Sequence, residues 1–110
     1  MKAMAQQGIL RHATDKGETY DVAAIKVDII PDGISITHLE FTKDGLALIK
    51  ESNYTNIMEI LRHEFDIYIP DIKVRYNGCK AKKIEQTGNQ DITKPFHGEI
   101  IFVCMNCEAP

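Results

Sequence analysis

The residues most able to do chemistry are three cysteines and four histidines. Cys104 and Cys107 form a CxxC pair, and thiolates together with neutral imidazole are suitable tetrahedral ligands of zinc. Cys79 and His97 are the candidates for a third and a fourth ligand. A second CxxC, or a closely spaced Cys/His pair, is missing from the sequence. Two interpretations therefore stay open for these residues: a zinc site, or ordinary core and terminal cysteines with no cofactor.

Catalytic uses of the cysteines have less support. A redox CxxC needs its first cysteine at a helix N-terminus, and the three residues after Cys107 are too few for a helix. A Cys79 nucleophile with His97 as its base is conceivable, since both follow or flank loops. The sequence contains no G-x-S-x-G motif, zincin motif or glycine-rich phosphate loop. These features favour a protein that is not an enzyme.

The stretch KVRYNGCKAK, which begins at Lys73, is the most distinctive part of the chain. Its central Asn-Gly pair is the strongest signal for a two-residue β-hairpin, because both residues tolerate the positive φ of the turn. That turn would place Arg75 opposite Lys80 and Lys73 opposite Lys82. Like charges directly across a strand pair are destabilising by about 0.2–1 kcal/mol, and an anionic partner would relieve the repulsion.

Two interpretations of this basic hairpin compete. It is either a docking surface for an anion or a set of lysines that keeps a strand soluble and discourages edge pairing. The formal net charge of −3 and the pI near 5.8 disfavour a dedicated nucleic-acid domain, which is usually basic overall. An acidic protein surface is therefore the favoured partner, bound by Lys73, Arg75, Lys80 and Lys82, and nucleic acid is the weaker one.

The elements that carry these residues follow from hydrophobic periodicity. Residues 21–30 alternate as a half-buried strand, a Pro-Asp-Gly turn follows, and a second strand covers residues 34–41. The apolar positions of this second strand change phase near Thr37 or His38, where a β-bulge is expected. The apolar run at residues 46–49 is expected to be a third strand, whose edge could pair in a homodimer.

The second half of the chain contains the expected helix. Apolar residues recur at helical spacing over residues 53–65, and Asn53 is a suitable N-cap. The basic hairpin and a buried strand at residues 100–103 follow. This order predicts an α+β fold with a mainly antiparallel curved sheet of about six strands, in two meander or hairpin halves, with one helix packed on one face. A partly closed barrel is the alternative if the ends of the sheet meet.

Length and composition place these elements in one domain, residues 1–110, whose residues 1–19 form a flexible or short helical N-terminal segment. No apolar run reaches the roughly 18 residues that span a bilayer, so no membrane association is expected. Three cysteines fit a reducing compartment, and the predicted location is cytoplasmic.

The sequence therefore predicts a small non-enzymatic interaction module, of the adaptor or inhibitor type. A regulatory module that contains zinc or binds nucleic acid, and a small Cys/His enzyme, are the alternatives.

Overall fold

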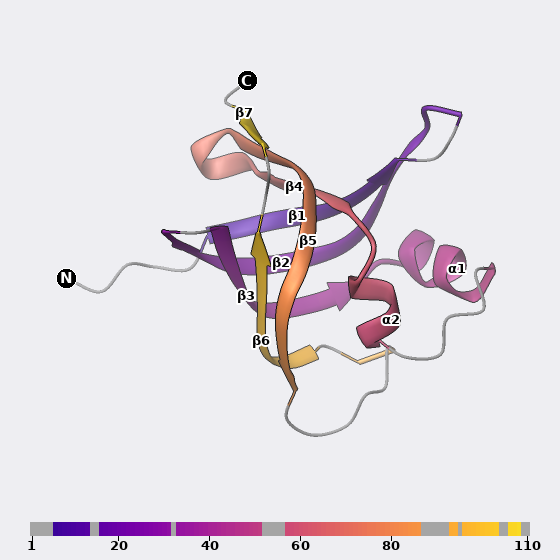
Figure 1. The fold of residues 1–110 in the computed structure, drawn as a ribbon. Helices are drawn as coiled ribbons and strands as arrows, with labels where there is room; N and C mark the ends of the chain where they lie inside the picture. The colour runs from indigo at the N-terminus through magenta and orange to yellow at the C-terminus, as the bar shows by residue number, and fades with distance from the viewer. Residues whose placement is uncertain are drawn as a thin grey trace.

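Six antiparallel strands of the chain close into a β-barrel in the computed structural model (Figure 1). The structure describes residues 6–13, 16–31, 33–51, 57–86, 93–94, 96–103 and 106–108, without the side chains of residues 57, 58, 86, 97 and 106–108. The strands are β1 (Gln6–Ala13), β2 (Thr19–Ile30), β3 (Gly33–Phe41), β4 (Phe65–Ile69), β5 (Val74–Gln86), β6 (Phe96–Val103) and β7 (Asn106–Glu108). The described helices are α1 (Lys43–Glu51) and α2 (Ile57–Leu61), and a 3₁₀ turn covers Pro70–Ile72.

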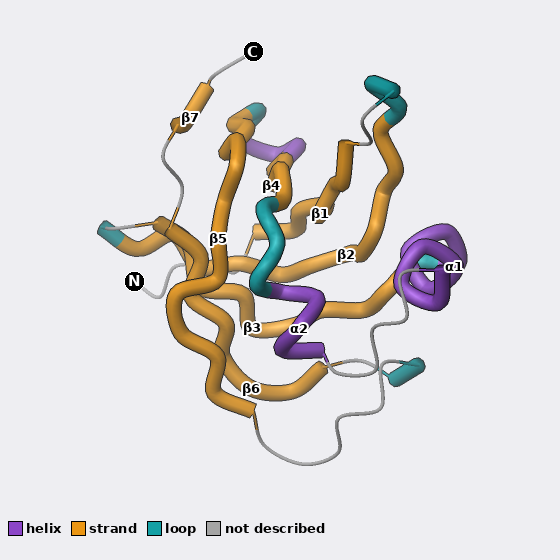
Figure 2. The backbone as a smooth tube through the Cα atoms, turned by 45° about the vertical axis from the view of Figure 1, so that its right-hand side comes forward, coloured by secondary structure: helices purple, strands orange, loops and turns teal. Residues whose placement is uncertain are grey.

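The barrel closes through β4. The strand order around it is β1-β2-β3-β6-β5-β4, and β4 pairs with both β5 and β1 (Figure 2). The backbone of Ile67 in β4 lies opposite Leu10 on one side and opposite Tyr76 on the other. The prediction of an open curved sheet is therefore wrong. Periodicity within each strand could not reveal the closure, because β1 and β4 are far apart in the chain.

The hairpin of β2 and β3 was predicted correctly, and so was the β-bulge within it. Strands β2 and β3 are antiparallel neighbours. Lys26 lies opposite His38, whereas the next residue, Val27, lies opposite Ile36. Thr37 is therefore the extra residue of a β-bulge, as the phase change of the apolar residues predicted.

Residues 46–49 are helical, in contrast to the predicted third strand. They belong to α1, which begins at Lys43 and has Thr42 as its N-cap. The Oγ1 atom of Thr42 accepts the Gly45 N–H at 2.9 Å, and its carbonyl oxygen accepts the Leu46 N–H at 2.9 Å. This N-cap, with an acidic first turn and a basic last turn, stabilises a helix here. The strand edge predicted as a homodimer contact therefore does not exist at these residues.

The predicted helix at residues 53–65 is shorter than expected. Helix α2 covers Ile57–Leu61, and residues 53–56, including the expected cap Asn53, lie outside the described residues. Phe65 already belongs to β4, where it alternates with Ile67 and Ile69 as the buried positions. Residues 65–69 form a strand and not a helix, because every second side chain is buried and the strand completes the barrel wall.

The N-terminal segment also contains a strand. Residues 6–13 form β1, where the sequence suggested a flexible or helical segment, and they pair with β2 along their length. Strand β6 contains the predicted buried run, and its Ile100 and Phe102 are fully buried. Side chains from every strand of the barrel wall meet in one apolar core, which includes Leu10, Val27, Ile36, Leu39, Ile67, Cys79, Ile100 and Phe102.

Candidate functional site

The basic stretch is part of one continuous strand, β5, and does not form a hairpin. Phe65 lies opposite Cys79 and Ile67 lies opposite Tyr76, so β5 contains one extra residue between these pairs. Gly78, with φ +63°, provides the left-handed conformation of this β-bulge. The predicted turn at Asn-Gly is therefore wrong. A turn there would fold β5 onto itself and remove it from its pairing with β4 and β6.

The carboxylate of Asp66 holds this bulge. Its Oδ1 atom accepts the Gly78 N–H at 3.1 Å, and its Oδ2 atom accepts a hydrogen bond from Arg75 Nη2 at 2.9 Å. The Asp66 side chain is 21% exposed. One partly buried carboxylate on β4 therefore binds both a backbone donor and a cationic side chain of β5. Arg75 has a structural contact and is not simply a solvated charge.

Lys80 forms a more exposed ion pair. Its Nζ atom lies 3.3 Å from Glu64 Oε1, and the two side chains are 63% and 61% exposed. The predicted repulsion between Arg75 and Lys80 is absent, because they lie along one strand and each faces a carboxylate. Exposed pairs of this kind contribute only about 0–1 kcal/mol, so Lys80 can exchange its partner at little cost.

The basic surface extends beyond the predicted residues. Lys73, Lys82 and Lys83 are exposed, and Lys83 Nζ lies 2.8 Å from Glu85 Oε1. The hydrogen bond to Glu85, and then its negative charge, raise the pKa of Lys83 above its ordinary value. Lys80 and Lys82 also line an open surface hollow of about 580 Å³, together with Glu64, Gly78, Ala81 and Val103. We call the outward face of Lys73, Arg75, Lys80, Lys82 and Lys83 the basic face.

Two of the predicted zinc ligands, Cys79 and His97, lie far apart along the barrel wall. Lys80, next to Cys79, lies opposite Val103, at the end of β6 that is remote from His97. The distance from His97 to Val103 is about 20 Å at the rise of a β-strand, so one ion cannot bind both Cys79 and His97. Cys104 lies outside the described residues, and the side chain of Cys107 is not described.

Cys79 also has no thiol group available for metal binding or catalysis. It is fully buried and disulfide-bonded, whereas the cysteine count suggested reduced thiols. In this form it is neither a thiolate ligand nor a nucleophile. Within the described ranges, no group of three or more His, Cys, Asp or Glu residues is arranged to hold a metal ion.

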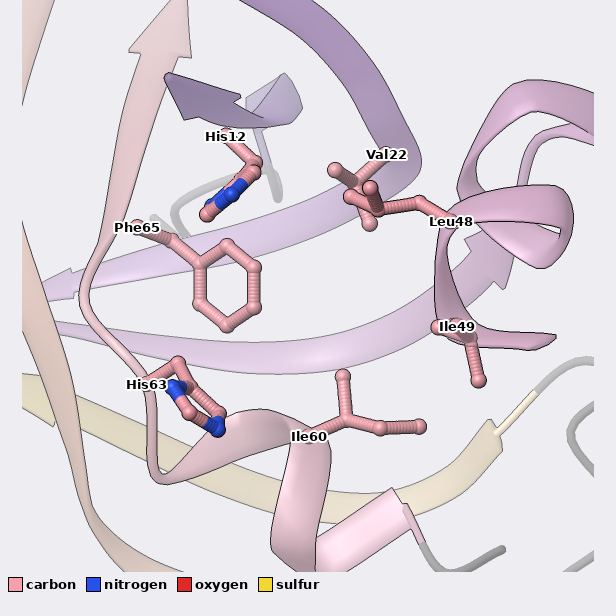
Figure 3. Close-up of a pocket in the computed structure, with 7 residues that line it drawn as sticks. All are labelled: His12, Val22, Leu48, Ile49, Ile60, His63 and Phe65. Carbon is pink, nitrogen blue, oxygen red and sulfur yellow. The ribbon is translucent and has the colours of Figure 1, made fainter. Parts of the chain in front are cut away.

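A pocket at one end of the barrel brings together residues that the sequence did not connect. His12, at the end of β1, and His63, between α2 and β4, lie on either side of the Phe65 ring (Figure 3). The two histidines are far apart in the sequence, and their proximity depends on the pairing of β1 with β4. No local signal could have identified this pair.

Comparison with known proteins identifies no relative of this chain. No protein-family model matches the chain, and no curated protein or solved structure is significantly similar to it. Among the described residues, no helix has the length and apolar character needed to cross a membrane.

Proposed function

We propose that the protein is a non-enzymatic interaction module that docks an acidic protein surface on the basic face of β5. The observation that carries this proposal is that four of the five exposed cationic side chains of the basic face lie along a single strand, β5, and that the fifth, Lys73, directly precedes it. A complementary acidic surface would increase the rate of association and determine the register of the complex.

Lys80 and Lys82 are the central residues of the proposed contact. Both line the hollow beside Val103, which gives an acidic side chain of the partner a depression to enter. The exposed bond from Lys80 to Glu64 contributes little stability, so a partner carboxylate can replace Glu64. Arg75 is a weaker candidate, because Asp66 already binds it in the bulge.

The overall charge supports a protein partner over nucleic acid. The chain is acidic as a whole, and Tyr76 packs against the core and offers no exposed ring for base stacking. Zinc-dependent and Cys/His enzymatic alternatives gain no support from the described residues, since Cys79 is buried and disulfide-bonded.

The test uses a fluorescent peptide of glutamate and aspartate residues, titrated with the protein at low salt and followed by fluorescence anisotropy. Reversal of both central charges, Lys80→Glu with Lys82→Glu, should raise the Kd at least tenfold. The matched control reverses Lys26 and Lys50, two exposed lysines outside β5, and changes the net charge equally. The control should raise the Kd by less than about threefold, because screening limits distant charges.

Two results would overturn the proposal. The first is equal weakening by the two double variants, which would indicate only a response to net charge. The second is absence of peptide binding at low salt together with tight, salt-sensitive binding of an oligonucleotide, which would favour the nucleic-acid alternative. Circular dichroism of each variant establishes that it is folded.

A further inference from the structure

The pocket at the barrel end has an apolar interior of about 260 Å³. Val22, Ile49, Ile60 and Phe65 line it and are at most 5% exposed, and Leu48 of α1 completes the wall (Figure 3). An apolar cavity of about 150 Å³ with comparable walls accommodates benzene. This pocket therefore has room for a ring system larger than benzene.

Two imidazoles give the pocket a polar side. The rings of His12 and Phe65 meet edge to face, with centroids 6.3 Å apart and planes at 64°. His63 lies on the other side of the Phe65 ring in the close-up view (Figure 3). Each imidazole donates one hydrogen bond when neutral and two when protonated. A ligand with an acceptor group at its polar end can therefore bind both the rings and the apolar wall.

An outer hollow of about 360 Å³ shares the two histidines and opens to solvent. Arg11, Glu64 and Asp66 also line it. Each of these three charged side chains forms an ion pair with a residue that does not line the hollow. Because the carboxylates are compensated in this way, an anionic group near the imidazoles meets little uncompensated negative charge.

We infer that this pocket binds a small aromatic carboxylate, with its ring against Phe65, Leu48 and Ile49 and its carboxylate at His12 and His63. An aromatic body is favoured because aromatic rings pack well edge to face or offset against Phe65. A carboxylate is favoured because it accepts hydrogen bonds from both imidazoles. The pocket does not include any residue of the basic face, but the inference uses Arg75 and Lys80 as the ion-pair partners of Asp66 and Glu64.

The probe for this inference is 2-naphthoate, titrated into isotope-labelled protein and followed by NMR. Saturable shifts should appear at Val22, Leu48 and Phe65. His12→Ala and His63→Ala should each raise the Kd about tenfold, the loss expected when a hydrogen bond to a charged group is removed. His38→Ala, which removes a partly exposed histidine of β3 outside the pocket, is the matched control and should leave the Kd unchanged.

Two further measurements test the apolar wall and the role of the carboxylate separately. Leu48→Trp should fill the apolar wall and abolish binding, with thermal unfolding used to establish that the variant is folded. The neutral analogue 2-naphthalenemethanol should bind more weakly than the carboxylate and lose less affinity in the histidine variants. The inference is overturned if 2-naphthoate does not saturate, if folded Leu48→Trp binds it normally, or if His38→Ala weakens binding as much as the pocket variants do.

Discussion

The carboxylate of Asp66 joins two strands of the barrel wall through two different bonds. It accepts the Gly78 N–H, which the bulge of β5 turns toward β4, and it accepts a hydrogen bond from Arg75. Without this acceptor, the partly buried Gly78 N–H would lose its hydrogen bond to the Asp66 side chain, and Arg75 would lose this ion pair.

We therefore expect Asp66→Ala to lower the free energy of unfolding by about 1–3 kcal/mol. The measurement is urea denaturation at neutral pH. Asp28→Ala, at an exposed position of β2, serves as the control and should change stability by less than about 0.5 kcal/mol. An equal loss in the two variants would show that the bulge does not depend on Asp66.

Tyr20 provides a test of local electrostatics. Its hydroxyl donates to Glu18 Oε2 at 2.6 Å, and this hydrogen bond, followed by the charge of Glu18, raises the pKa of the phenol above its ordinary value. The stability contributed by this contact is present below the ordinary pKa of the phenol and is lost as the pH rises through the raised pKa.

Glu18→Gln should bring the Tyr20 pKa back toward its ordinary value, as measured by NMR titration of the Tyr20 ring. Glu51→Gln is the control, because Glu51 contributes only a minor electrostatic effect on the same phenol. Equal titration of Tyr20 in the wild-type protein and in Glu18→Gln would contradict the contact.

Helix α1 depends on a close approach to β2. A Cβ atom at Gly45 would collide with the carbonyl oxygen of Val22. Alanine normally stabilises a helix relative to glycine by about 1 kcal/mol, so the collision predicts a change of the opposite sign. Gly45→Ala should lower the free energy of unfolding by about 1–3 kcal/mol in urea denaturation.

Glu51→Ala, at an exposed position of the same helix, should change stability by no more than about 0.5 kcal/mol. A Gly45→Ala variant as stable as the wild-type protein would mean that α1 does not pack against β2 as closely as described.

For β5, the sequence predicted which side chains face solvent, but it did not predict whether the chain turns or continues as one strand. The predicted pairing placed Arg75 and Lys80 on one face, and in the structure both are exposed, whereas Cys79 is buried and Tyr76 packs against the core. A two-residue turn and a one-residue bulge both keep Tyr76 and Cys79 on one side. The choice between turn and bulge depends on β4, which the sequence around Asn77 does not contain.

In the other elements, too, the sequence showed features that depend on neighbouring residues but not features that depend on strands far apart in the chain. The alternation in β2 and the phase change at Thr37 are local, and both were predicted. The Thr42 cap was also a local signal, but the apolar run after it was interpreted as a strand. The placement of His12 and His63 in one pocket depends on β4 pairing with β1, so no spacing along the chain could indicate the pocket.

The barrel core contains one cysteine that is disulfide-bonded, Cys79. Cys79 points into the core and is disulfide-bonded, and the chain has three cysteines. One intrachain disulfide uses two of them, so unreduced protein unfolded in denaturant should show one reactive thiol per chain with a thiol-specific dye. Reduction should raise this count to three. Three thiols before reduction would contradict the bond and return Cys79 to the set of available thiols.

We propose that this barrel binds an acidic protein surface on the outside of β5. The most direct test is an NMR titration with the glutamate and aspartate peptide at low salt, with backbone shifts mapped along the chain. We expect the largest shifts to fall on Lys80, Lys82 and Glu64 and to disappear as salt is added. Shifts confined to the strands opposite β5, or shifts that persist at high salt, would contradict it.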